Sequence, residues 1–162
     1  MVQIKHIGIS DYFVSDASYD LRTSGLGSCV AIILYDKVNL IGGLSHIMLP
    51  ERPTNKKAHD FKKYCNTNIP VFIQSMIDAG ASKKKLQGAL FGGAEMFRYQ
   101  KNPLMNIGKR NIAAATRILE EQNIPIQFQN VGGRKGRTIH LHIKKGEIIL
   151  RTAFEEDIIY SF

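Results

Sequence analysis

Tryptophan is absent from this 162-residue sequence, cysteine occurs only twice, and no apolar run is long enough to cross a membrane as a helix. Two cysteines cannot form the disulfide framework of a small secreted protein, so the fold must rest on an ordinary buried core. The first residues also lack the apolar segment of a signal peptide. These absences predict a cytoplasmic protein with free thiols and no membrane insertion. With a hydrophobic fraction of 44%, residues 1–162 can bury a core as a single domain.

Acidic residues are fewer than basic ones, since 14 Asp and Glu against 22 Lys and Arg give a formal net charge of +8. This charge favours acidic partners. Nucleic acid is one such partner, but the basic residues are scattered and accompany no recognised nucleic-acid-binding motif. We therefore expect no nucleic-acid partner, which leaves an acidic protein surface.

Apolar periodicity predicts two helices, one over residues 69–79 with Pro70 in its first turn and one over 107–122 with Asn106 as its cap. Strand-like runs are more numerous: 3–9, 12–14, 30–35, 40–49, 86–91, 126–129, 139–143 and 147–152. The stretches left as linker, loop or unassigned tail are 16–20, 51–68 (with a short helix over 58–64) and 154–162. Two helices among these strands predict an α+β fold, a mixed or antiparallel sheet sandwich with flanking helices.

A cysteine and a histidine come together in the segment 21–50. A loop of small residues ends on Cys29, and two strand-like runs follow, of which the second carries His46. If Lys37 and Val38 form a two-residue hairpin loop, Cys29 lies directly opposite His46, with Cβ atoms roughly 4.5–5.5 Å apart. A thiol beside an imidazole is the arrangement of an activated nucleophile. The alternative is an ordinary hairpin with a structural cysteine and a hydrogen-bonded histidine.

A resemblance to a known family is carried by GLGSCVAIILYD and GGLSHIMLP, and it continues through IPVFIQSMIDAGA, LFGGAEMF, NIGKRN and VGGRKGRTIHL. These stretches resemble the CheD family, the chemoreceptor glutamine deamidases of bacterial chemotaxis. The resemblance implies a catalytic triad of Cys29, His46 seventeen residues later, and Thr23 six residues before the cysteine. It also implies an architecture similar to the cysteine-dependent toxin deamidases.

The reaction implied by the resemblance converts specific glutamines on the cytoplasmic helices of chemoreceptors to glutamate, with release of ammonia. The Cys29 thiolate would form a thioester, and backbone N–H groups around Gly27 and Ser28 would stabilise the oxyanion. No cofactor or metal is required. The family's regulatory partner is the CheC-type chemotaxis phosphatase. The alternative function is a non-catalytic adaptor that docks receptors or this phosphatase, and a third is an amidase or transglutaminase acting on another protein.

Other reactive side chains have simpler explanations. Cys65 has no glycine-rich loop beside it and is expected to be a structural thiol. The spacing of the cysteines from His46 and His59 matches no compact zinc motif. His140 and His142 share one strand face, a geometry that can hold metal, but they are expected to be solvated. The basic segment 132–137 lacks the spacing of a phosphate-binding P-loop and is predicted to be a β-hairpin turn.

Overall fold

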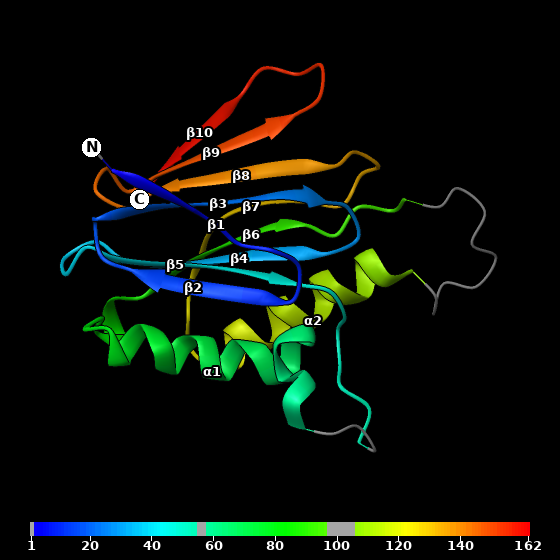
Figure 1. Ribbon diagram of the computed structural model, residues 1–162. Helices are drawn as coiled ribbons and strands as arrows, with labels where there is room; N and C mark the ends of the chain where they lie inside the picture. The colour runs from blue at the N-terminus through cyan, green and yellow to red at the C-terminus, as the bar shows by residue number, and fades with distance from the viewer. Residues whose placement is uncertain (1, 55–57, 97–105) are drawn as a thin grey trace.

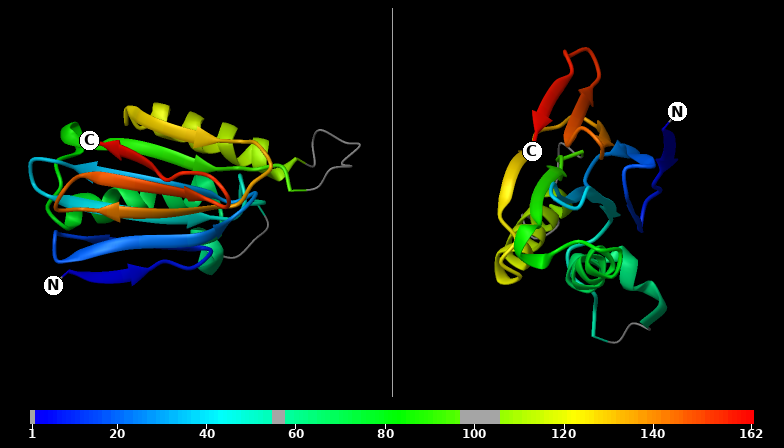
Figure 2. Two further views of the ribbon diagram at one scale, coloured as in Figure 1. Left: turned by 90° about the horizontal axis from the view of Figure 1, so that it is seen from above. Right: turned by 90° about the vertical axis from the view of Figure 1, so that its left-hand side faces the viewer.

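The computed structural model describes residues 2–54, 58–96 and 106–162, which form three layers (Figure 1). Two five-stranded sheets lie face to face, and two helices cover the far side of one of them. The helices run along the strand direction when the molecule is viewed from above (Figure 2). The predicted α+β sheet sandwich is therefore confirmed, with both flanking helices on the same side.

The outer sheet has the strand order β1-β3-β8-β9-β10, and no helix of the described residues covers it. Its strands are β1 (Gln3–His6), β3 (Tyr19–Leu26), β8 (Arg137–His142), β9 (Glu147–Thr152) and β10 (Ile158–Ser161). Within this sheet β1 and β3 pair in parallel, and the other described neighbours pair antiparallel. The unassigned tail thus docks, because β10 pairs with β9.

The central sheet has the order β2-β5-β4-β6-β7 and lies between the outer sheet and the helices. Its strands are β2 (Asp11–Ser15), β5 (Ile41–Ile47), β4 (Val30–Asp36), β6 (Gln87–Gly92) and β7 (Ile126–Val131). Side chains of β4 alternate between two cores. Leu34 packs towards the helices, whereas Ile33 packs between the sheets. Both faces of β4 are therefore buried, which explains its unbroken apolar sequence.

The helices are α1 (Cys65–Asp78) and α2 (Ile107–Glu121), with short 3₁₀ helices η1 (Ala58–Lys63) and η2 (Lys83–Lys85). Asn106 caps α2 as predicted, since its side-chain oxygen accepts a hydrogen bond from the Lys109 amide. The prediction for α1 was wrong by one turn. Its first turn is held by tertiary contacts, including a 2.9 Å hydrogen bond from the Cys65 amide to the Leu49 carbonyl, so Pro70 lies inside the helix. Across the described ranges, each helix is too short or too polar to span a membrane.

Two connections also differ from expectation. The stretch around Thr23 is not a loop but belongs to β3, because Leu21 and Thr23 point into the core while Asp20 and Arg22 alternate with them on the other face. The segment 132–137 is not a hairpin turn. It links β7 in the central sheet to β8 in the outer sheet, and Arg137 donates back to the Gly132 carbonyl at 2.8 Å.

Candidate active site

The hairpin of β4 and β5 has a different register from the one predicted. Asp36 pairs with Ile41 and Ala31 with His46, so Cys29 is diagonal to His46 rather than opposite it. The loop has four residues because Asp36 accepts hydrogen bonds from the Val38 and Asn39 amides, both at 3.0 Å. An Asp side chain that bonds the backbone two residues on stabilises such a turn, and no two-residue loop forms.

Cys29 and His46 nevertheless share one face of the central sheet. Cys29 packs in the core between the two sheets together with Ala31, the residue that pairs with His46. The imidazole enters the same space, since it contacts Thr23 of the outer sheet. Diagonal neighbours on one sheet face have Cα atoms roughly 7–8 Å apart, within reach of extended side chains. The revised register therefore keeps the thiol and the imidazole on one face of the sheet, although no hydrogen bond joins the two side chains among the described residues.

Thr23 connects the imidazole to the backbone of the N-terminal segment. Its hydroxyl lies 2.7 Å from His46 Nδ1 and donates to the Ile7 carbonyl at 2.8 Å. A hydroxyl has one proton, and a carbonyl can only accept. Because the Thr23 proton goes to Ile7, the imidazole must donate its Nδ1 proton to Thr23 Oγ1. This leaves Nε2 of a neutral His46 without a proton.

Burial sets the charge of this pair. His46 is 3% exposed, and desolvation lowers its pKa to about 4. Its Nε2 atom is buried and has no hydrogen-bond partner among the described residues. Burial also raises the pKa of Cys29 above its usual value. Near neutral pH the site therefore holds a neutral thiol and a neutral imidazole with a free lone pair.

The turn that carries Cys29 is fixed by the end of β6. Gly93 donates its amide to the Cys29 carbonyl at 2.8 Å, and Ala94 donates to the Gly27 carbonyl at 2.9 Å. Gly92 has a φ of +99°, and a Cβ there would lie 2.4 Å from the Cys29 carbonyl oxygen. Only glycine permits that approach without displacement. Glycine at the end of β6 is therefore required by its close contact with the backbone of the Cys29 turn.

Asn111 of α2 joins the two halves of the site, a role that the sequence alone did not reveal. Its Nδ2 donates to the Ser28 carbonyl at 2.8 Å and to the Met48 carbonyl at 3.0 Å, and the residue is fully buried. Since both partners are acceptors, the amide must face them with nitrogen. One signal in the sequence could have identified Asn111. It lies four positions before the apolar Ala115, and positions four apart share a helix face, so a polar side chain is placed on the buried face.

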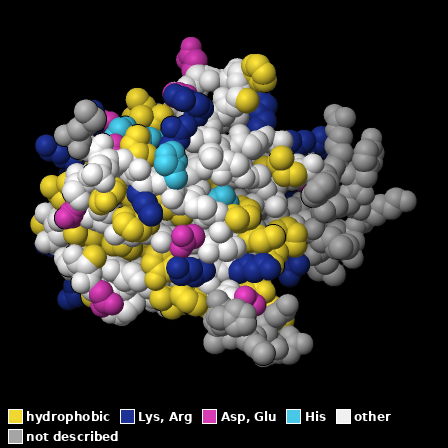
Figure 3. All heavy atoms as spheres, in the orientation of Figure 1, with side chains coloured by type: hydrophobic (Ala, Val, Ile, Leu, Met, Phe, Trp, Pro, Cys, Tyr) yellow, Lys and Arg dark blue, Asp and Glu magenta, His cyan; other side chains and the backbone are white. Residues whose placement is uncertain are grey.

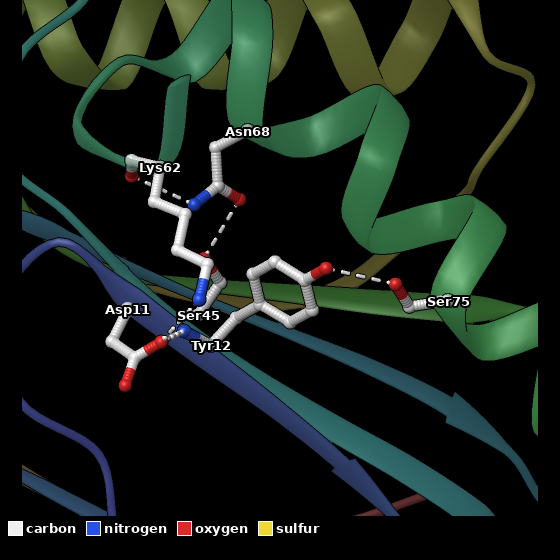
Figure 4. A network of polar contacts seen from close by, with 6 residues as sticks. All are labelled: Asp11, Tyr12, Ser45, Lys62, Asn68 and Ser75. Carbon is white, nitrogen blue, oxygen red and sulfur yellow. Dashed lines mark hydrogen bonds and ion pairs between the residues drawn. The ribbon is translucent and has the colours of Figure 1, made fainter. Parts of the chain in front are cut away.

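A second polar network holds the strand behind His46 (Figure 4). Ser45, which alternates with His46 and faces the helices, donates to Asn68 at 2.9 Å, and Asn68 donates to the Lys62 carbonyl at 2.8 Å. Tyr12 of the neighbouring strand contacts the Ser75 hydroxyl at 2.9 Å. These contacts attach β5 and β2 to α1 and η1, so they fix the backbone from which His46 projects.

The remaining residues singled out in the sequence have different environments. Cys65 is fully buried and far less acidic than an ordinary thiol, since desolvation raises its pKa to about 12. The Gly27 amide is already bonded to the Gly25 carbonyl at 3.2 Å. His140 and His142 are not freely solvated, because both contact Asp20 of the unpredicted strand β3.

A family model and curated relatives point to one family. A family model described as CheD chemotactic sensory transduction matches residues 48–152. A Thermococcus kodakarensis protein named probable chemoreceptor glutamine deamidase CheD is 38% identical over 153 residues, which cover 94% of this chain and 95% of that protein. A Bacillus velezensis protein named chemoreceptor glutamine deamidase CheD is 42% identical over 148 residues, with coverages of 90% and 89%.

A solved structure is similar to this chain in fold but not in sequence. It is the crystal structure of a Neisseria meningitidis protein of the DUF152 family, with a TM-score of 0.52 and 9% sequence identity over 82% of this chain and 64% of that chain. The relatives at 38% and 42% identity and the family model carry the assignment. The chain belongs to the CheD family of chemotactic sensory transduction proteins.

Proposed function

We propose that this chain is a protein-glutamine deamidase of chemoreceptors, with Cys29 as nucleophile, His46 as general base and acid, and Thr23 as the group that orients the imidazole. The observation that carries the proposal is the buried, unpartnered Nε2 of His46 on the face that it shares with Cys29. The names of its relatives support the choice of substrate, since both are called chemoreceptor glutamine deamidases.

The reaction starts from the neutral pair. Nε2 of His46 takes the Cys29 proton as the sulfur attacks the side-chain amide carbon of a substrate glutamine, because the thiolate is the nucleophilic form. The imidazolium then gives its proton to the departing amide nitrogen, and ammonia leaves a thioester. Water hydrolyses the thioester while His46 accepts the water proton and returns one to sulfur. The substrate residue is now glutamate, and no cofactor takes part.

Thr23 has a defined task in this scheme. By accepting a hydrogen bond from Nδ1–H, Thr23 holds the ring in the tautomer whose Nε2 can accept a proton, and it stabilises the imidazolium formed during attack. The Ile7 carbonyl accepts the hydrogen bond from the Thr23 hydroxyl, so the hydroxyl oxygen is left to accept from the imidazole. A triad that rests on a neutral hydroxyl leaves the resting histidine neutral, in keeping with its low pKa.

The oxyanion requires donors that are free in the resting enzyme. Gly27 is a poor source, since its amide already has a partner. Outside the strands, no backbone acceptor is found for the Ser28 amide among the described residues, and the Cys29 amide faces its own thiol, a contact that opposes the rise of the thiol pKa. We therefore assign the oxyanion site to these two amides, held in place by the Asn111 and Gly93 contacts to the neighbouring carbonyls.

The proposed setting is the cytoplasm, where chemoreceptors expose their helical signalling domains and a CheC-type phosphatase would regulate the enzyme. A non-catalytic adaptor would bind the same partners without changing them. The two functions differ in one product, glutamate in place of glutamine on the receptor.

The test is to incubate the purified protein with chemoreceptor cytoplasmic fragments and to map converted glutamines by peptide mass spectrometry. We expect glutamate at a few defined positions, and none with His46→Gln, which should still bind the fragment in a pull-down. Amine incorporation instead of hydrolysis would indicate a transglutaminase. Binding without any conversion would support the adaptor and contradict the enzyme.

A further inference from the structure

Two histidines and an aspartate converge on the exposed face of the outer sheet, opposite the face that carries Thr23. Asp20 lies on β3, and His140 and His142 lie on the neighbouring strand β8. All three point away from the core because they alternate with the buried Leu21, Ile139 and Leu141. Histidine side chains gather at the surface over β1, β3 and β8 (Figure 3). The proposed deamidation uses none of these three residues.

The three ligand atoms converge closely. Asp20 Oδ2 is 3.2 Å from His140 Nε2 and 2.5 Å from His142 Nδ1, and all three atoms lie within 4.8 Å of one another. A tetrahedral zinc ion with bonds of roughly 2.0–2.1 Å needs its ligand atoms roughly 3.3 Å apart. The His140 contact already has that spacing, and the His142 contact must lengthen by about 0.8 Å.

The three ligands lie on paired strands and need only a small adjustment to bind an ion. The Asp20 side chain is 11% exposed and those of His140 and His142 are 17% and 26% exposed, so the carboxylate is covered by the imidazoles. The two rings contact each other with centroids 4.2 Å apart. Ligands held on adjacent strands lose little freedom when an ion binds, which favours affinity.

Nearby charges limit which ligand can complete the site. A pocket beside His140 is lined by Arg22 and Arg151, while Glu147 pairs with His142 across β9. A divalent ion on one aspartate leaves a net positive charge, to which Arg22 adds, whereas Arg151 is paired with Asp157 at 3.0 Å. The fourth position is therefore suited to hydroxide or another small anion from solvent.

We propose that Asp20, His140 and His142 bind one divalent transition-metal ion of the zinc class, which links β3 to β8. Two imidazoles and one carboxylate suit this class. On binding, each imidazole carries its proton on the other ring nitrogen, so the N–H contacts to Asp20 are replaced by metal bonds. Because an unfolded chain does not hold the three groups together, the ion stabilises the folded protein.

The experiment uses the full chain with Cys29→Ala, so that the Cys29–His46 pair cannot bind the metal. Zn²⁺ is titrated while the unfolding temperature is followed, and Co²⁺ while its visible absorption is followed. We expect one ion per chain and a rise of roughly 5–10 °C at a free Zn²⁺ concentration about 100 times the dissociation constant.

The variants His140→Gln and His142→Gln should each lose most of the shift, while His6→Gln should keep it, because His6 is an exposed residue of the same sheet outside the cluster. The metal-free unfolding temperature of each variant shows that it folds. Two results would overturn the metal site and leave only a hydrogen-bonded cluster. The first is no rise in unfolding temperature in the Cys29→Ala chain. The second is a rise in His140→Gln and His142→Gln as large as in the Cys29→Ala chain.

Discussion

At the residue scale, the proposed chemistry depends on one hydroxyl. Thr23→Val keeps the shape of the side chain but leaves the Nδ1 proton of His46 and the Ile7 carbonyl without their buried partner. A hydrogen bond lost in this way costs about 1.4 kcal/mol or more, which is roughly a ten-fold loss of rate. Thr23→Ser retains the hydroxyl and should retain most of the activity. Deamidation rates of the two variants test this, and equal rates would refute the orienting role.

His46 gives the folded protein a specific pH dependence. Its pKa is about 4 when folded and 6.5 in the reference state. Between these values the unfolded chain binds a proton that the folded chain does not, so stability falls as the pH is lowered from 6.5 to 4. The full loss is roughly 3 kcal/mol.

The measurement is the free energy of unfolding at several pH values for the wild type and His46→Gln. The variant should lack this part of the acid destabilisation, so the two curves should converge as the pH falls. The deamidation rate should likewise begin to fall only well below pH 6.5, because His46 stays neutral until the pH approaches its pKa of about 4. Parallel stability curves would mean that His46 titrates normally.

At the scale of elements, Asn111 attaches α2 to both strands that carry the site. Asn111→Ala removes the donor for the Ser28 and Met48 carbonyls, so the Cys29 turn loses its fixed relation to β5. We expect kcat to fall at least ten-fold with little change in KM, and stability to fall by about 1–3 kcal/mol.

Asn68→Ala is the matched control, because Asn68 is equally buried but bonds Ser45 and the Lys62 carbonyl rather than the Cys29 turn. It should lose similar stability and much less kcat. If the two variants lose activity in proportion to stability, Asn111 is a structural residue and not a positioning one.

The elements themselves were largely predictable from periodicity. The apolar run of β4 and the capped helix α2 have strong local signals. The register of the β4–β5 hairpin was not predictable, since it depends on the bonds of Asp36 to the turn amides and to the Ser82 amide from a distant segment. The strand β3 was missed because its outward residues are charged and its inward Thr23 is polar. The 2.7 Å contact between Thr23 and His46 joins the two sheets, so local hairpin geometry could not have predicted it.

At the scale of the molecule, the two cores share the central sheet and should unfold together. Ile33→Ala opens a cavity between the sheets, and Leu34→Ala opens one on the helix side. Each should lower the free energy of unfolding by about 2–5 kcal/mol. We expect a single transition in both variants, with the same midpoint by far-ultraviolet and tyrosine near-ultraviolet circular dichroism. Separate midpoints would show that the layers are independent units.

The central claim is that Cys29, and not the second buried thiol, attacks the substrate. The most direct measurement is a deamidation time course on a chemoreceptor cytoplasmic fragment with Cys29→Ala and Cys65→Ala, each checked for folding and for fragment binding. Cys65→Ala should convert glutamine at close to the wild-type rate when both are assayed at a temperature at which the variant is fully folded. Cys29→Ala should bind the fragment but convert no glutamine above background. Glutamine-to-glutamate conversion by Cys29→Ala at the wild-type rate would contradict the account.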